Sequence, residues 1–537
     1  MVKKISNVLH QQNSIFGASL ILVITLFLSN VLGVVRDHYL TQKIPTDLLS
    51  SYYAAFRIPD LIFNVLILGA IASAFIPVFT TLITQKKNQE AWLVAASVIN
   101  IAIIFLVLSS LILVVIIPYL MPFIVPGFDV AHRELTVKLA RIMLASPILF
   151  GLSYIFGGIL NSFKRFFVYS LAPLVYNLTI ITGTLLFASK YSVTGVAVAV
   201  VCGAFLHFLI QLPVAIKLGF RWHFKIALHH WGVKRIGLLM FPRAIALGSN
   251  QIMLLVFTAI ASAIGGYAIA VYTLADNIQT MPTVVFGTSF ATAIFPTLAE
   301  SASSGKDSNF GNHVGRMIRI ILFFMVPMTI MIYLLRAEIV RLILGSGFFG
   351  WEQTIATANA LGFFALSLVF SGLIPLFSRS FYALHNTKIP MIITVIGVLV
   401  SVTLAKIFAN KLGVGGLALA FSAGSFITAS ILYFILRKKI KLENEKEIAI
   451  FILKIILAGV LAAIAIQESK MIIGLFVNMQ RSWGVAIKTL VSLGAGTLVY
   501  LLCCWIFGCE EIRSIKLIFL KFGGHPINES GKEESIQ

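Results

Sequence analysis

The sequence predicts an all-α polytopic membrane protein with fourteen transmembrane helices. Of its 537 residues, 59% are apolar and only 11% are charged, and the mean hydropathy of +0.98 lies far outside the range of soluble globular proteins. The apolar residues form long runs, and a helix needs about 20 of them to cross a bilayer. Long uninterrupted runs, rather than short alternating segments, indicate helices and not a β-barrel.

Fourteen apolar runs are long enough to span a membrane, and they are separated by short polar loops. The predicted spans are 15–35, 50–84, 91–117, 135–160, 169–189, 193–217, 234–263, 268–299, 315–336, 355–384, 389–409, 413–437, 448–468 and 483–507.

The basic residues predict how the chain is oriented in the membrane. With the N-terminus inside, 26 of the 41 Lys and Arg residues fall in inner segments and 14 in outer ones, as the positive-inside rule requires. We therefore expect both termini in the cytoplasm. The positive charge is explained by topology and by anionic lipid headgroups, so nucleic acid is not expected as a partner.

Several chemistries find no support in the sequence. The first apolar run lacks a convincing cleavage site for a signal peptide before Arg36. The four cysteines have neither C-x-x-C spacing nor nearby histidines, so no metal or cofactor is expected. No Walker loop, H-E-x-x-H or G-x-S-x-G motif is present, so the chain is not expected to be an enzyme.

An internal duplication runs through the first twelve predicted spans. Five landmarks recur in the same order at a nearly constant offset, among them the VPGF loop at Gly127 and the GSGF loop at Gly347. Each half contains six spans, so both halves begin on the same side of the membrane and the repeats are parallel. Transporters with such repeats bind substrate between the halves and alternate access by rocking them.

The duplication divides the chain into five parts. They are an N-terminal six-helix lobe at 1–217, a cytoplasmic linker at 218–233, a C-terminal six-helix lobe at 234–437, two additional helices within 438–507, and a cytoplasmic tail at 508–537.

Charged residues stand beside two apolar runs near the start of the chain. Arg36 and Asp37 end the first span, and Arg57 and Asp60 begin the second. Ionisable groups in a membrane are costly unless they face a protein interior or a water-filled cavity, so these residues are candidates for a functional site.

The repeat pairs Arg57 with Asp276, which occupies the equivalent place in the eighth span. We expect these opposite charges to form an outer gate that closes when the cavity opens inward. The alternative is that both are solvated charges in the interfacial zone. Arg243 either lines an inward-open cavity or extends to the inner interface, and Asn177 is expected to hydrogen-bond between helices.

The opening stretch resembles the MurJ/MviN lipid II flippases of the MOP exporter superfamily. The resemblance rests on VLGVVRD from Val31, AAFRIPDL from Ala54 and G-A-x-x-x-A-F-x-P from Gly69, and it continues through the LAP sequence at Leu171 and the Y-x-x-A-D segment at Tyr272. Twelve spans followed by two more is also the arrangement of that family.

The resemblance implies a function in building the bacterial cell wall. Members of the family move undecaprenyl-pyrophosphate-linked disaccharide-pentapeptide from the inner to the outer leaflet of the cytoplasmic membrane. Arg36, Arg57 and Arg243 would then bind the diphosphate, because guanidinium groups match phosphate oxygens. Asp37, Asp60, Asp276 and Asn277 would orient these arginines or form the gate. The two additional helices would form a groove for the lipid tail.

Some of the family's charged positions hold other residues here. Asn30, Phe63 and Asn277 stand where the family has arginine, and Leu68 and Thr280 replace acidic residues. The seventh and eleventh spans contain no Asp or Glu, although sodium-site acids are reported there in some members.

The expected function is therefore a lipid II flippase that works by alternating access. The alternatives are a flippase for another polyprenyl-linked oligosaccharide, a cation-coupled drug antiporter and a non-transporting scaffold for envelope synthesis. The expected partners are the lipid-linked glycan, membrane lipids and cell-wall synthesis proteins.

Overall fold

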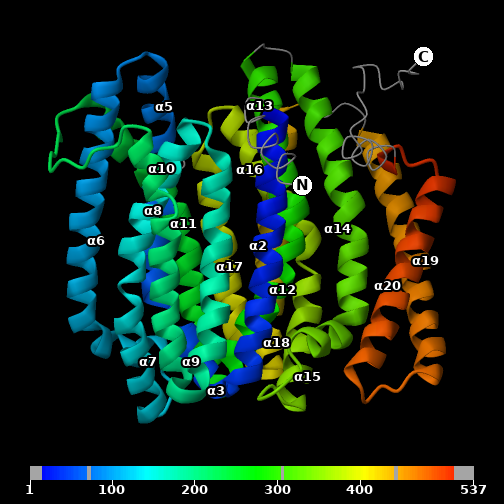
Figure 1. Ribbon diagram of the computed structural model, residues 1–537. Coiled ribbons are helices and arrows are strands. Elements are labelled where there is room, and N and C mark those ends of the chain that lie inside the picture. The colour runs from blue at the N-terminus through cyan, green and yellow to red at the C-terminus, as the bar shows by residue number, and fades with distance from the viewer. Residues whose placement is uncertain (1–14, 69–73, 304–306, 441–444, 513–537) are drawn as a thin grey trace, which may run out of the picture. The chain divides into compact units, whose positions relative to one another are not determined.

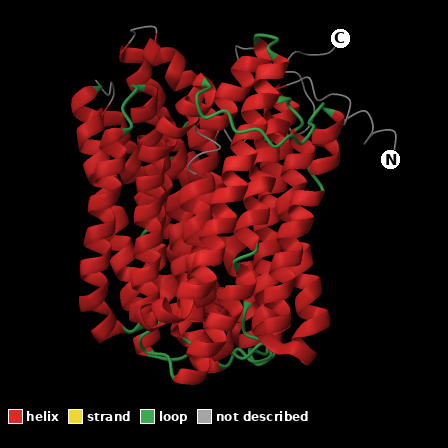
Figure 2. Ribbon diagram, turned by 90° about the vertical axis from the view of Figure 1, so that its left-hand side faces the viewer, coloured by secondary structure: helices red, strands yellow, loops and turns green. Residues whose placement is uncertain are grey.

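The computed structural model describes residues 15–68, 74–303, 307–440 and 445–512, and these residues contain helices and no strand (Figures 1 and 2). The basic tail from Arg513 and the GAIAS part of the Gly69 motif lie outside the described residues.

The helices before the chain midpoint are the following: α2 (Ile15–Lys43), α3 (Thr46–Ala55), α4 (Arg57–Ile62), η1 (Phe63–Leu68), α5 (Ile76–Thr84), α6 (Asn88–Ile124), α7 (Val130–Met143), α8 (Ser146–Ser162), α9 (Phe166–Leu209), α10 (Leu212–Lys217) and α11 (Trp231–Ile264). The helices after it are α12 (Ala268–Pro282), η3 (Thr283–Thr288), α13 (Ser289–Ser303), α14 (Asp307–Ile343), α15 (Trp351–Ala365), α16 (Leu368–Ala383), α17 (Lys388–Leu412), α18 (Val414–Lys439), α19 (Glu445–Phe476) and α20 (Ser482–Ile506).

These helices agree with the fourteen predicted spans. Among the described residues, ten helical stretches are long and apolar enough to cross a membrane, or eleven if the bent pair α15 and α16 is one span. One of the ten contains the whole of α9, which breaks at Ser192 and accounts for two predicted spans. The two others are α2 and the broken run from α3 to α5. The all-helical fold class is confirmed.

Unusual backbone geometry recurs at equivalent places in the two halves of the repeat. The six-residue π-helices η1 and η3 begin at Phe63 and Thr283, which the repeat offset relates to each other. Ser192 (φ 48°, ψ −144°) and Gly413 (φ 57°, ψ −134°) are related by nearly the same offset and adopt nearly the same conformation. A duplicated six-helix unit predicts such recurrences, because equivalent breaks between helices require equivalent backbone angles.

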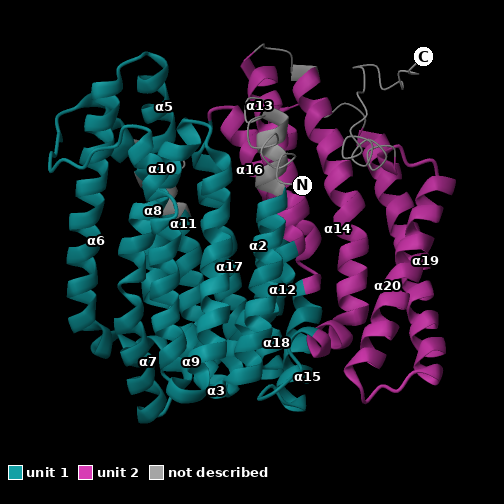
Figure 3. Cartoon of the chain, in the orientation of Figure 1, with its two compact units in different colours: residues 1–281, 343–364, 386–428 teal, residues 282–342, 365–385, 429–537 magenta. Residues whose placement is uncertain are grey.

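The chain folds into two compact units, coloured separately in Figure 3. Unit 1 contains residues 1–281, 343–364 and 386–428. Within it α2 and α8 pack along α9, α3 packs on α7, and α11 packs on α17.

Unit 2 contains residues 282–342, 365–385 and 429–537. Its largest helix pair is α19 with α20, and α16 packs against η3 and α13. The Tyr500 hydroxyl of α20 donates to the Phe323 carbonyl of α14 over 2.9 Å. Buried Glu338 of α14 accepts from Lys470 of α19 (3.1 Å) and Lys488 of α20 (3.3 Å). These polar contacts fix both additional helices to α14.

Candidate functional site

The predicted site residues gather near one end of unit 1. We call this the Lys43 end, because α2 ends there at Lys43 and α3 begins at Thr46, at the lower edge of unit 1 in Figure 3. Pro45 precedes α3 and cannot continue α2, so the chain turns back into the bundle at this point. The charged end of α2 therefore lies beside the charged start of the second predicted span.

Arg36 and Asp37 form the first part of the site. The Arg36 guanidinium donates through Nε (3.1 Å) and Nη2 (2.9 Å) to Asp37 Oδ1, and through Nη1 to Asn177 Oδ1 of α9 (3.2 Å). Asn177 in turn donates to the Ser29 carbonyl of α2 over 3.2 Å, so its predicted role between helices is confirmed. The Asp37 side chain is only 4% exposed, whereas that of Arg36 is 21% exposed.

Asp37 also connects the two predicted halves of the chain. Its second oxygen, Oδ2, accepts a hydrogen bond of 2.8 Å from Asn277 Nδ2 of α12. Arg36, Asp37 and Asn277 thus form one hydrogen-bonded chain. Hydrogen bonds to a charged group are worth about 1.5–3 kcal/mol each, more than those between neutral groups.

Arg57 reaches across to the other half of the chain, where its partners are threonines. It donates through Nε to Thr258 Oγ1 of α11 (2.7 Å) and through Nη2 to Thr273 Oγ1 of α12 (3.2 Å). Arg57 is 8% exposed, and none of the described carboxylates forms an ion pair with its guanidinium. Its positive charge is therefore buried, and its hydrogen-bond partners are neutral hydroxyl groups.

The predicted ion pair between Arg57 and Asp276 is not formed in this structure. Asp276 instead accepts from Gln279 Nε2, one turn further along α12, over 2.8 Å. Arg57, which belongs to α4, contacts α12 at Thr273, one turn before Asp276. Its guanidinium therefore lies near Asp276 without forming an ion pair with it.

The other two predicted site residues are placed differently. The Asp60 side chain lines a cavity and forms no ion pair or side-chain hydrogen bond with the described residues. Arg243 lies in α11, and its side chain is outside the described part of the structure.

Three further hydrogen bonds connect the halves at the Lys43 end, and we did not predict them from sequence. Ala270 N donates to Ser50 Oγ (3.1 Å), Gly127 N donates to Ser262 Oγ (3.1 Å), and His38 Nδ1 lies 2.6 Å from the Ile343 carbonyl oxygen. Serines and backbone groups carry no distinctive sequence signal, and the repeat offset relates equivalent positions rather than contacting ones, so the sequence does not indicate these hydrogen bonds.

The repeat does explain the two glycine loops. A Cβ atom on Gly127 would lie 2.2 Å from the Ser262 carbonyl oxygen, and one on Gly347 would lie 2.1 Å from the Gln42 carbonyl oxygen. The two glycines are equivalent in the repeat, and so are the two residues that face them. Each loop therefore packs its glycine against the end of the first helix of the opposite half, in two equivalent contacts.

The family comparison agrees with this architecture. A model of the family described as lipid II flippase MurJ matches residues 45–494. The probable lipid II flippase MurJ of Rickettsia prowazekii (strain Madrid E) is 28% identical over 464 residues, covering 85% of this chain and 90% of that protein. The protein of the same name from Rhizobium tropici is 30% identical over 435 residues, covering 78% of this chain and 80% of that protein.

Solved structures give the same result. A structure described as lipid II flippase MurJ in an inward closed conformation matches with a TM-score of 0.75 and 26% identity, over 91% of this chain and 98% of that chain. An inward-facing MATE family transporter of the MOP superfamily shares the fold, with a TM-score of 0.64 and 18% identity over 76% of this chain and 94% of that one. Fold, repeat and sequence together show that this chain, a multi-pass protein of the bacterial inner membrane, belongs to the lipid II flippase MurJ family of transporters and is not an enzyme.

Proposed function

We propose that this protein moves undecaprenyl-pyrophosphate-linked disaccharide-pentapeptide from the inner to the outer leaflet by alternating access. The observation that supports this most directly is the presence of two arginines, half-buried Arg36 and buried Arg57, within a fold shared with lipid II flippases. Arg57 has no ion-pair partner among the described residues, so its charge is costly inside a membrane protein, and a diphosphate headgroup would offset that cost.

Arg36 and Arg57 have hydrogen-bonding capacity left for such a ligand. Three of the five N–H groups of Arg36 and two of those of Arg57 are engaged by protein acceptors. Because the partners of Arg57 are neutral hydroxyls, phosphate oxygens can replace them with a net gain in electrostatic attraction. Arg243 is a third diphosphate ligand in this proposal.

The contacts at the Lys43 end form the outer gate in this proposal. In this proposal the Lys43 end lies on the periplasmic side and both termini lie in the cytoplasm, and the excess of basic residues in the opposite loops supports this orientation. Asp37 and Asn277 would hold the gate closed, and Arg57 would contribute through Thr258 and Thr273 rather than through an ion pair with Asp276. The structure then corresponds to a state that is closed to the outside.

The lobes at 1–217 and 234–437 are the moving bodies in this mechanism. The π-helices that begin at Phe63 and Thr283 support this division into two lobes. Helices commonly kink at a π-helical turn, so the second helix of each repeat can bend at the equivalent place. The α19–α20 pair would hold the polyprenyl tail, and cell-wall synthesis proteins would receive the flipped product.

A depletion experiment tests the function. Bacteria that lack their own flippase would express this chain, and labelled lipid II in the outer leaflet would be measured. We expect transfer with the wild-type chain, loss of transfer with Arg36→Ala at normal membrane levels, and retention with Arg336→Ala, whose guanidinium is exposed. Rescue of growth without leaflet transfer would contradict a flippase and favour a scaffold.

A further inference from the structure

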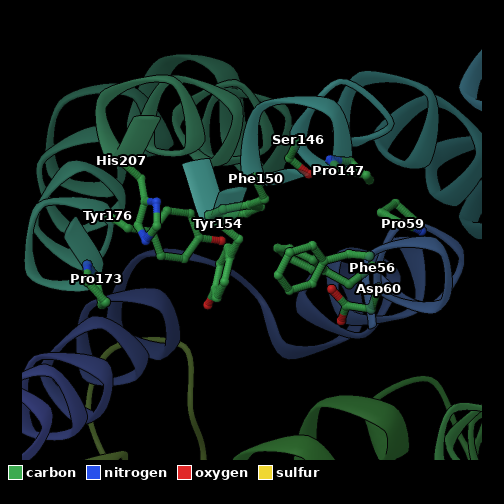
Figure 4. Close-up of a pocket in the computed structure, with 11 residues that line it drawn as sticks. Phe56, Pro59, Asp60, Ser146, Pro147, Phe150, Tyr154, Pro173, Tyr176 and His207 are labelled. Atoms are coloured by element: carbon green, nitrogen blue, oxygen red, sulfur yellow. The ribbon is translucent and has the colours of Figure 1, made fainter. Parts of the chain in front are cut away.

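A cavity of about 230 Å³ lies inside unit 1, and neither Arg36 nor Arg57 is among the residues that line it (Figure 4). Its walls come from the segment Phe56–Phe63, from α8 and from α9, all within the first half of the repeat. Five aromatic rings and three prolines line it, with Asp60, Ser146 and His207 as the remaining lining residues.

The aromatic rings brace one another, so the cavity is preformed. The Phe63 ring centroid lies 5.4 Å from that of Phe150 and 5.1 Å from that of Tyr154. Phe150 also makes an edge-to-face contact of 5.1 Å with Tyr176. Rings that are held by such contacts form an aromatic lining, and the face of each ring carries partial negative charge that attracts a cation.

Asp60 is the acidic group of this cavity. Figure 4 shows its carboxylate at the rim of the open space that Tyr154 and Phe56 also border. It has no ion pair or side-chain hydrogen bond with the described residues. The nearby arginines point elsewhere, since Arg57 is bound to two threonines and Arg36 to Asp37 and Asn177.

The other polar groups of the cavity do not neutralise Asp60. The His207 ring lies 2.6 Å from the Ser153 hydroxyl through Nδ1 and stacks on Tyr154. The Ser146 hydroxyl donates to the Met143 carbonyl over 2.6 Å. A carboxylate within membrane-spanning helices is costly without a counter-ion.

We propose that this cavity binds an organic ammonium group, with Asp60 as its counter-ion and the aromatic faces as cation–π partners. Aromatic walls with one carboxylate are suited to an ammonium ion, which is weakly hydrated when substituted. The cavity volume of about 230 Å³ is much larger than a bare metal ion requires. Among the described residues no group of three or more His, Cys, Asp or Glu side chains could hold a metal.

The binding experiment uses the full-length protein in lipid nanodiscs and tetramethylammonium chloride as the probe, with NaCl at equal ionic strength as the reference. Thermal stability and heat of binding are measured together. We expect saturable stabilisation by the probe and none by NaCl, because a ligand that binds only the folded state stabilises it.

Two variants and a matched control locate the site. Asp60→Asn keeps the shape of the side chain and should weaken probe binding at least about tenfold, and Tyr154→Leu should weaken it severalfold. Glu134→Gln removes one exposed carboxylate elsewhere and should leave binding unchanged. Equal affinity in the wild type and Asp60→Asn, or the same saturable effect with NaCl, would overturn the proposal. If Asp60→Asn does not fold, Tyr154→Leu decides it.

The ammonium group could be carried by the cargo or by a soluble amine. The two sources are distinguished by a transport assay in which the amino groups of the substrate's pentapeptide are acetylated. If the cargo carries the group, acetylation should slow flipping by the wild type but not by Asp60→Asn. If a soluble amine is the ligand, acetylation should have no effect. Probe binding requires no flipping, so its failure is distinct from a failure of the proposed function.

Discussion

Substitution of Gly127 by alanine should open the Lys43 end. In this structure a Cβ atom at Gly127 would lie 2.2 Å from the Ser262 carbonyl oxygen and 2.6 Å from Ala263 Cα. Both are backbone atoms, so no side-chain rotation can relieve the contact. The end of α11 must move away from the loop that contains Gly127, and this movement separates the two halves of the repeat.

The magnitude follows from the cost of overpacking. An extra methyl group in a well-packed contact costs about 1–3 kcal/mol. The contact exists only while the halves are closed, so the cost falls on the closed state and increases the open population about 5- to 150-fold. Gly347 makes the equivalent contact but has a φ of +63°, so its substitution adds backbone strain in either state. Gly127 therefore gives the clearer result.

The assay measures exposure of a buried serine. Ser51 is fully buried, and its hydroxyl has no partner among the described residues. Ser51→Cys in a background without the native cysteines reports opening through the rate of labelling by a membrane-impermeant maleimide. The matched control is Gly33→Ala, because a Cβ atom on Gly33 in α2 would meet no atom within 4 Å.

We expect Gly127→Ala to increase the labelling rate by one to two orders of magnitude and Gly33→Ala to leave it unchanged. If both variants label at the wild-type rate while the protein remains folded, the glycine contact does not hold this end closed, and our description of the gate is wrong.

Four other substitutions test individual contacts. Thr258→Val removes a hydrogen bond of 2.7 Å from buried Arg57 and should increase labelling of the same reporter about tenfold. Glu338→Gln removes the carboxylate partner of two half-buried lysines, so thermal unfolding should show a loss of about 3 kcal/mol, with faster hydrogen exchange in α19 and α20. Gly397→Ala places a Cβ atom against the Thr428 hydroxyl and should cost about 1–3 kcal/mol, whereas Gly494→Ala meets nothing within 4 Å and should be neutral or slightly stabilising. Ser192→Gly relieves a positive φ of 48° and should raise stability by about 1 kcal/mol; an unchanged melting temperature would show that Ser192 is not strained.

The sequence alone was sufficient to identify the spans, the duplication and the family. A membrane forces backbone groups to bond within each segment, so a run of apolar residues predicts a helix without knowledge of its neighbours. The nearly constant repeat offset also related Gly127 to Gly347 before any contact was known. Charges at Arg36, Asp37 and Arg57 could be selected as site candidates, because ionisable residues are rare beside apolar spans.

Only the tertiary structure decided which groups these charges meet. The offset paired Arg57 with Asp276, but the side chain instead contacts Thr258 and Thr273, because periodicity shows which residues share a helix face and not how a helix is rotated against its neighbour. The aromatic cavity beside Asp60 is assembled from the segment Phe56–Phe63 and from α8 and α9, which come much later in the chain, and no local pattern predicts that they meet. Such contacts depend on the packing of whole helices, and this information is spread over the entire chain.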